Sequence, residues 1–204
     1  MKRIPTVVLV AAFIAGAAVQ TDAYVLLASK WKVAKVTMHM QLGSAAVNLI
    51  DASGTWNKAA QPALSQWNAK MKNMQFAAVM NSTKPKAYRN DVNNVFFSSK
   101  YYGYSFGSTT LAVCLSSWYT SSLATFETDV VFNTKYKWNS YRGNLRSSSN
   151  PGVDIRRVAI HEFGHALGLG HTSNSTAIMR PIISNQDKIG TDDIAGAQKL
   201  YGKR

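Results

Sequence analysis

Short apolar runs, several of them alternating with polar residues, recur through the first two thirds of the chain. Alternation at every second residue is typical of a strand with one buried face, and short continuous apolar runs are typical of strands buried on both faces. The intervening segments are rich in Gly, Ser, Asn and Asp, which favour turns. We therefore expect five strands, at Val33–Leu42, Gln75–Met80, Asn94–Ser98, Thr109–Ser116 and Thr128–Phe132.

Three other segments repeat their apolar residues at three- and four-residue steps, which predicts amphipathic helices. The first is Thr55–Met71, which carries Pro62 near its start and a stripe containing Trp56 and Trp67. The second is Asp154–Leu169, with Asp154 as the N-cap and glycines at its end. A short third helix is expected at Thr191–Tyr201, capped by Thr191. Strands mixed with helices in this order predict an α+β domain.

The segments that connect these strands and helices allow fewer predictions. An aromatic loop, Tyr101–Gly107, joins two of the expected strands and either contacts a substrate or folds back onto the domain. Residues 135–150 are expected to form irregular surface chain. No Pro-rich or Gly/Ser-rich linker interrupts residues 24–204, so we expect one domain there.

The N-terminus has the pattern of a secretory signal peptide. Lys2 and Arg3 supply positive charge, Ile4–Val19 is apolar, and Thr21 and Ala23 are small. The alternative is a retained membrane anchor, but the apolar run is shorter than the roughly 18 residues that spanning needs. We expect residues 1–23 to be removed after Ala23, leaving a secreted or periplasmic protein.

Composition limits the classes of protein to which this chain can belong. With 46% hydrophobic and 16% charged residues the chain is not disordered, and a single cysteine excludes an intramolecular disulfide framework. The formal net charge of +13 is compatible with nucleic acid, acidic substrates or anionic surfaces. Because no nucleic-acid motif is present, we expect no specific nucleic-acid partner. We also expect the protein to be a monomer.

Three of the four histidines lie within eleven residues of the second expected helix and its end. His161 and His165 are four residues apart, so their side chains lie on one helical face. Gly168 allows the chain to bend out of the helix, which brings His171 back toward the same point. Three neutral imidazoles leave one coordination position open, which is typical of a catalytic zinc.

Glu162 directly follows the first of these histidines. It is expected beside the metal, placed to take a proton from zinc-bound water. The alternative, a helix with surface histidines at this spacing by chance, does not explain why Glu and Gly occupy the positions between them. His39 is expected to be an ordinary strand residue.

The segment HEFGHALGLGH resembles the extended zinc motif HExxHxxGxxH of the metzincin metallopeptidases. Ala177–Pro181 resembles their Met-turn, which implies that Met179 forms an apolar floor beneath the histidines. Thr172 and residues 192–202 are similar to the matrixin branch, the type found in matrix metalloproteinases. The resemblance implies a zincin-like α+β fold, with a twisted, mostly parallel five-stranded sheet, an antiparallel edge strand, two long helices and a C-terminal helix.

The same resemblance implies a secreted zinc endopeptidase that hydrolyses peptide bonds with a zinc-activated water and Glu162 as general base. Its protein or peptide substrate would lie extended along the edge strand, at Leu111, Ala112 and Val113. A pocket just past the scissile bond would be lined by Pro181, Ile182 and Ile183. The alternative is an exported binding module that keeps the metal site but is catalytically silent.

Departures from the family pattern change some expectations. Only His39 remains for a second, structural zinc, so we expect one zinc per chain. Calcium is unsupported because acidic residues are few, although backbone carbonyls keep it open. Cys114 lies in an apolar strand and is expected to be a buried, inert thiol rather than a latency switch. Ile183 stands where the family often has Tyr, which predicts a more apolar pocket wall.

Overall fold

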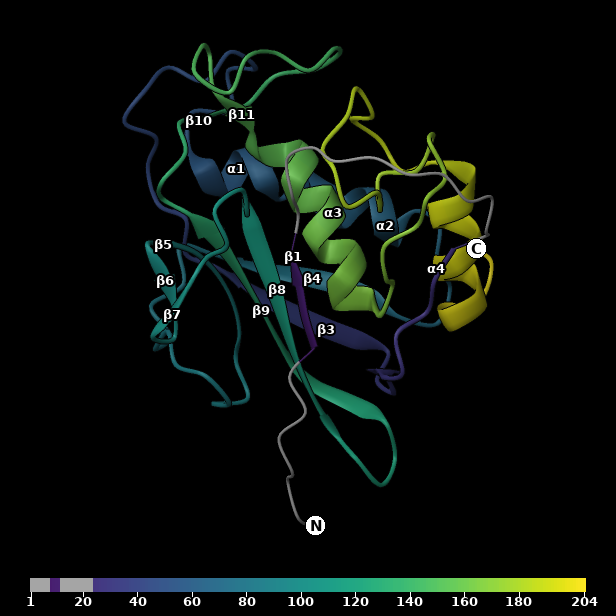
Figure 1. Ribbon diagram of the computed structural model, residues 1–204. Coiled ribbons are helices and arrows are strands. Elements are labelled where there is room, and N and C mark those ends of the chain that lie inside the picture. The colour runs from purple at the N-terminus through teal and green to yellow at the C-terminus, as the bar shows by residue number, and fades with distance from the viewer. Residues whose placement is uncertain (1–7, 12–23) are drawn as a thin grey trace.

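The computed structural model describes the backbone of residues 8–11 and all atoms of residues 24–204. It shows a twisted sheet covered on one face by helices, with the C-terminal helix at the side of the domain (Figure 1). The expected signal peptide falls on residues 1–23 and, apart from the strand at 8–11, lies outside the described residues. Within the described part of the chain, no helix is long and apolar enough to cross a membrane.

The main sheet has the strand order β1-β8-β9-β5-β3-β4, and β2 also pairs with β9. The pairs among β4, β3, β5 and β9 are parallel, as is β2 with β9, whereas β8 runs antiparallel to β9. The strands are β1 (Val8–Ala11), β2 (Lys30–Trp31), β3 (Lys35–Met40), β4 (Gln75–Met80), β5 (Asn93–Ser98), β8 (Ala112–Tyr119) and β9 (Ala124–Asn133).

All five expected strands are present, with small shifts in their ends. The sheet nevertheless holds seven strands among the described residues rather than the expected five, because the short β1 and β2 add to it. The expectation of an edge strand at β8 is also wrong in this structure. The backbone of β1 pairs antiparallel with the outer side of β8, from Val113 to Ser116. An unpaired strand edge readily accepts such an added strand.

Alternating side chains divide the buried residues between the two faces of the sheet. Val95 and Val130 belong to the large core beneath the helices. Phe96, Val113 and Val131 face the opposite side and form a smaller core with aromatic side chains of the following loop. The central strands thus have apolar residues on both faces, and both faces of the sheet are covered by other parts of the chain.

The first expected helix is interrupted, which corrects the expectation of two long helices. It forms α1 (Trp56–Ala60) and α2 (Pro62–Asn68), with Gln61 between them. Pro62 lacks the N–H that a continuous helix needs and is tolerated at the first position of a new one. The aromatic stripe still faces the core, because Trp67 is fully buried and its Nε1 donates to the Ile160 carbonyl at 2.9 Å.

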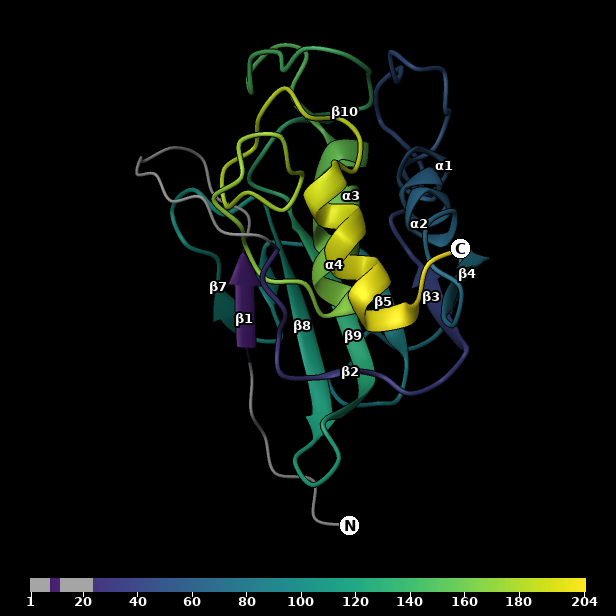
Figure 2. The ribbon, with the colours of Figure 1, turned by 90° about the vertical axis from the view of Figure 1, so that its right-hand side faces the viewer.

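The second helix, α3 (Ile155–Leu167), begins and ends as expected. The Asp154 side chain accepts from the Arg156 amide at 3.2 Å as the N-cap. Gly168 ends the helix in the left-handed region with φ +107°, and a Cβ at this position would lie 2.7 Å from the Ser29 carbonyl oxygen. The last helix, α4 (Thr191–Tyr201), is capped by Gly190 instead of Thr191 and lies alongside α3 (Figure 2).

The aromatic loop folds back onto the domain, one of its two expected alternatives. It contains a small hairpin, β6 (Lys100–Tyr101) and β7 (Tyr104–Ser105). Tyr101 is buried, and its ring lies 5.1 Å from that of Phe106. The segment expected to be irregular, 135–150, contains the short strand β10 (Trp138–Asn139), which pairs in parallel with β11 (Val153–Asp154) before α3.

Candidate metal centre

Helix α3 and the bend that follows it bring three imidazoles together. The Nε2 atoms of His161 and His165 are 2.9 Å apart, and each lies 3.2 Å from Nε2 of His171. Two nitrogens bound to one tetrahedral zinc at about 2.0–2.1 Å would lie about 3.3 Å apart. The three nitrogens are therefore spaced to share one ion, and no other group of three or more His, Cys, Asp or Glu in the described chain is this close.

The second ring nitrogens of His161 and His165, their Nδ1 atoms, are held by backbone carbonyls. Nδ1 of His161 lies 2.8 Å from the Ile178 oxygen, and Nδ1 of His165 lies 2.7 Å from the Leu169 oxygen. A carbonyl only accepts, so each Nδ1 carries the proton and each Nε2 presents its lone pair to the centre. Such outer contacts orient metal-binding imidazoles and increase their basicity.

Burial keeps the three histidines neutral. Burial, together with His171, lowers the pKa of His161 to about 3, and burial lowers the pKa of His171 to about 4. The pKa of His165 is also lowered by burial and by its two neighbours. Neutral imidazole is the form that binds a metal, so no proton competes for these nitrogens near neutral pH.

Glu162 is fully buried beside the histidines, and burial raises the pKa of its carboxyl group well above the usual value. Neither carboxylate oxygen has a hydrogen-bond partner within the described chain. A buried carboxylate without a partner is costly, and such groups are found where a water, an ion or a substrate completes the site. This orphaned group and the convergent imidazoles both fit a hydrated metal ion.

The segment expected to form a Met-turn, Ala177–Pro181, packs against the histidine helix at Gly164. Met179 is buried, and a side chain on Gly164 of α3 would overlap its sulfur atom, so Gly164 permits this close contact. The segment is tied down by the buried carboxylate of Asp193 at the start of α4. Asp193 accepts from the amides of Ile178 at 2.8 Å, Met179 at 3.1 Å and Gly190 at 2.6 Å.

Asp193 was missed by the sequence reasoning. It fixes Ile178, whose carbonyl in turn holds His161, and so it supports the centre from another helix. Burial raises the pKa of Asp193, although its three backbone hydrogen bonds lower it. Its proximity to a helix start was the only signal in the sequence, and helix starts commonly contain Asp for capping alone.

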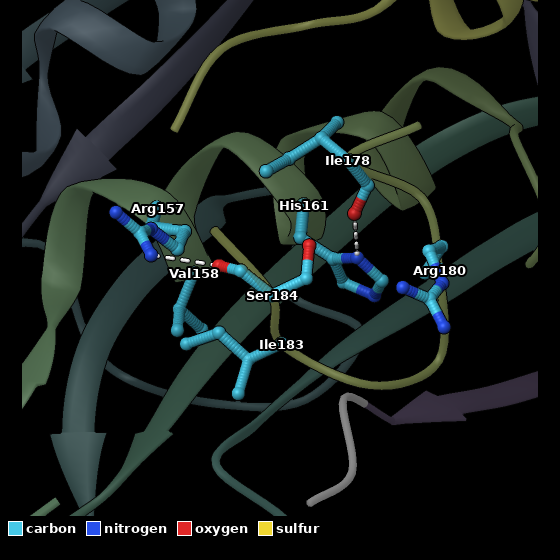
Figure 3. Close-up of a pocket in the computed structure, with 7 residues that line it drawn as sticks. All are labelled: Arg157, Val158, His161, Ile178, Arg180, Ile183 and Ser184. Atoms are coloured by element: carbon cyan, nitrogen blue, oxygen red, sulfur yellow. Dashed lines mark hydrogen bonds between the residues drawn. The ribbon is translucent and has the colours of Figure 1, made fainter. Parts of the chain in front are cut away.

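A small cavity of about 10 Å³ opens beside His161 (Figure 3). Of the three residues expected to line a pocket here, Ile183 does so, whereas Pro181 and Ile182 are half-buried and do not line this cavity. Ile183 gives it an apolar wall, as expected, but the cavity also contains two cations that the sequence reasoning did not assign to it. Its other lining residues are Arg157, Val158, Ile178, Arg180 and Ser184.

The residues expected to bind a substrate along the sheet are buried. Leu111, Ala112 and Val113 each expose 1% or less of their surface. Any contact with a peptide would therefore be made through backbone groups. The Leu111 carbonyl already accepts from the Asn133 amide at 2.9 Å, and Val113 is paired with Ala11 of β1.

Two residues considered for other roles lie in ordinary surroundings. His39 is in β3, and its Nδ1 lies 2.8 Å from the Ser82 hydroxyl. Cys114 is a free, buried thiol in β8 whose pKa is raised well above the usual value by burial and by the nearby charge of Glu162. A buried thiol that stays protonated is a poor metal ligand and nucleophile.

Comparisons with known proteins agree with this geometry. The profile of the Matrixin family matches residues 30–202. Human Matrilysin is 40% identical over 80 residues, covering 37% of this chain and 27% of that protein. Metalloendoproteinase 1-MMP of Arabidopsis thaliana is 47% identical over 62 residues, covering 29% and 17%, and mouse Matrix metalloproteinase-19 is 50% identical over 56 residues, covering 26% and 11%.

The matched segments thus span about a quarter or less of the length of these relatives. The family profile, in contrast, extends over most of the present chain and includes the sheet, the histidine helix and the C-terminal helix. The resemblance found in the zinc motif is therefore confirmed over the whole domain, and the chain belongs to the matrixin family.

Proposed function

We propose that this protein is a zinc-dependent endopeptidase that hydrolyses peptide bonds, with His161, His165 and His171 as the zinc ligands and Glu162 as the general base. One observation carries the proposal. Three neutral imidazole nitrogens converge within 3.2 Å of one another, next to a buried carboxylate that has no partner within the described chain.

A zinc ion held by the three Nε2 atoms supplies a Lewis acid, which lowers the pKa of water from about 15.7 toward about 7 and polarises a carbonyl group. The protein orients the imidazoles that would hold this ion. The Ile178 and Leu169 carbonyls hold two imidazoles in the tautomer that presents Nε2, and the buried Met179 packs against Gly164 of the same helix.

Glu162 moves the proton. Its carboxylate takes a proton from the attacking water and later gives it to the nitrogen of the departing amine, so one group acts as base and then as acid. Burial raises the pKa of this carboxyl group. A carboxylate with a raised pKa is a stronger base, and its protonated form persists long enough to serve the second step.

The substrate would lie extended beside β8, using backbone hydrogen bonds near Leu111, Ala112 and Val113. That side of β8 is occupied by β1 from Val113 onward. Because β1 falls within the expected signal peptide, cleavage after Ala23 would free this edge. We accordingly place the active enzyme outside the cell, with residues 24–204 as the catalytic domain.

The alternative is a binding module that keeps the metal site but has no activity. Such a protein would need the three histidines but not Glu162. A buried carboxylate without a partner costs on the order of 1–3 kcal/mol or more, so it would be a liability without a catalytic role. The unpartnered carboxylate therefore favours the enzyme.

The test is the Glu162→Gln variant, which keeps the shape of the side chain but not its basicity. We expect one zinc per chain by elemental analysis, as in the unaltered protein, and a roughly 10²–10⁴-fold slower hydrolysis of unfolded protein. His165→Ala should lose the zinc, and His39→Ala should keep both zinc and activity.

Two outcomes contradict the proposal. Undiminished hydrolysis by Glu162→Gln would remove this residue from the reaction. If the zinc-loaded protein without its first 23 residues hydrolyses no unfolded protein, and a chelator makes no difference, the silent binding module is the better account.

A further inference from the structure

The cavity beside His161 contains two arginines in different electrostatic situations. Figure 3 shows Arg157 and Arg180 on opposite sides of the His161 ring. Arg157 is buried, and its guanidinium donates to the carbonyls of Ser184, at 2.7 Å, and Gly143. Its Nε lies 3.7 Å from the Asp154 carboxylate, so its charge is both fixed and balanced.

Arg180 has no such partner. It is half-buried and follows Met179 directly, and no carboxylate of the described chain lies within 4 Å of it. An unbalanced cation at a partly desolvated site attracts an anion more strongly than a fully exposed one. Arg180 therefore gives this cavity a positive charge that no anion of the described chain balances.

The cavity is also small. A volume of about 10 Å³ holds about one water molecule. Arg157 lines it and is held in place by backbone carbonyls of two different loops, so this part of the wall is fixed. A long or bulky side chain does not fit without moving this network, whereas a short one does, and Arg180 is among the residues it would meet.

From these observations we propose that Arg180 is a specificity-determining residue, which selects substrates with a short acidic side chain, aspartate, directly after the scissile bond. This inference rests on the proposed function, because it assumes that a peptide carbonyl is attacked at the histidine centre. A peptide bound there places its next side chain at the cavity beside His161. The carboxylate then pairs with Arg180, while Val158, Ile178 and Ile183 contact its methylene group.

The test compares three fluorogenic peptides that differ only in the residue after the scissile bond, which is Asp, Asn or Leu. Mass spectrometry of the products identifies the bond that is cut. For the unaltered protein we expect kcat/KM for the Asp peptide to exceed that for the Asn peptide by roughly 3- to 10-fold, the range of a partly screened ion pair. The Leu peptide should be slower than the Asp peptide, and added salt should reduce the ratio of Asp to Asn.

Arg180→Gln should bring the ratio of Asp to Asn close to one while leaving the zinc content unchanged. Lys58→Gln is the matched control. It removes the same charge from an exposed position on α1, outside the cavity, and should leave the ratio as it is. A ratio near one in the unaltered protein overturns the inference. So does an equal loss for all three peptides in Arg180→Gln, which would mean that Arg180 acts on something other than the side chain.

Binding separates a failure of this inference from a failure of the proposed function. Fluorescence anisotropy with labelled Asp and Asn peptides is measured on Glu162→Gln, with and without Arg180→Gln. Preferential binding of the Asp peptide that requires Arg180 supports the inference even if no peptide is hydrolysed, an outcome that would contradict the endopeptidase function alone. Equal binding of both peptides overturns the inference, whatever the activity.

Discussion

Replacing Asp193 by Asn tests how far the histidine centre depends on the C-terminal helix, α4. The carboxylate accepts three backbone N–H groups, from Ile178 and Gly190 on Oδ2 and from Met179 on Oδ1. Asparagine has nearly the same shape but only one accepting oxygen. In either orientation its NH₂ group faces at least one of these N–H groups, so at least one buried donor loses its partner.

The expected cost follows from these contacts. A hydrogen bond to a charged group contributes about 1.5–3 kcal/mol, and an unsatisfied buried donor costs a further 1–3 kcal/mol or so. We expect the free energy of unfolding to fall by about 2–4 kcal/mol. Displacement of Ile178 also loosens the contact to Nδ1 of His161, and loss of such a contact typically weakens metal binding by about 10–100-fold.

Urea unfolding gives the stability, and competition with a fluorescent chelator gives the zinc affinity. Asp192→Asn is the matched control. The Asp192 carboxylate accepts one backbone N–H, from Tyr24 at 2.8 Å, and within the described chain no hydrogen bond joins it to residues 177–181. If Asp193→Asn matches this control in both stability and zinc affinity, the proposed link from α4 through Ile178 to His161 is wrong.

Three other predictions concern the sheet, the helix contact and the metal. Burial, followed by Glu127, raises the pKa of Asp129 to about 8, so the folded state holds a proton that the unfolded state releases near pH 4. Stability should therefore fall as the pH rises from about 4 to 8, and Asp129→Asn should flatten this dependence by on the order of 4 kcal/mol between pH 5 and pH 9 in urea unfolding; an unchanged slope contradicts the assignment. Gly164→Ala should lower the free energy of unfolding by about 1–3 kcal/mol, because the added methyl group overlaps Met179, and an equally stable variant would show that Met179 moves freely. Chelation should lower the melting temperature of the unaltered protein but not that of His165→Ala, and equal shifts in both would place the stabilising ion elsewhere.

The sequence predicts the histidine centre well because its determinants are local. The four-residue spacing of His161 and His165 depends only on helix geometry, and the bend at Gly168 depends only on the conformational freedom of glycine. The same is true of the Asp154 cap and of the strand positions. Each of these follows from a pattern among residues close together in the chain.

Other features were not predictable because they depend on distant contacts. Two of the three partners of Asp193 lie 14 and 15 residues away, in a segment without periodicity. Arg157 would ordinarily be assigned to the exposed face of an amphipathic helix, but carbonyls of two separate loops make a buried position for it. The break at Gln61 between α1 and α2 was predictable in part. Pro62 indicated that the helix could be interrupted, but only the structure shows that a new helix begins there.

The closeness of the three histidines in the chain has a thermodynamic consequence. Because only nine residues lie between His161 and His171, bringing them together costs little loop-closure entropy even in the denatured chain. An unfolded molecule therefore retains some capacity to chelate. Excess zinc should consequently protect the native state less than its native affinity alone implies, since part of the binding energy is also available after denaturation.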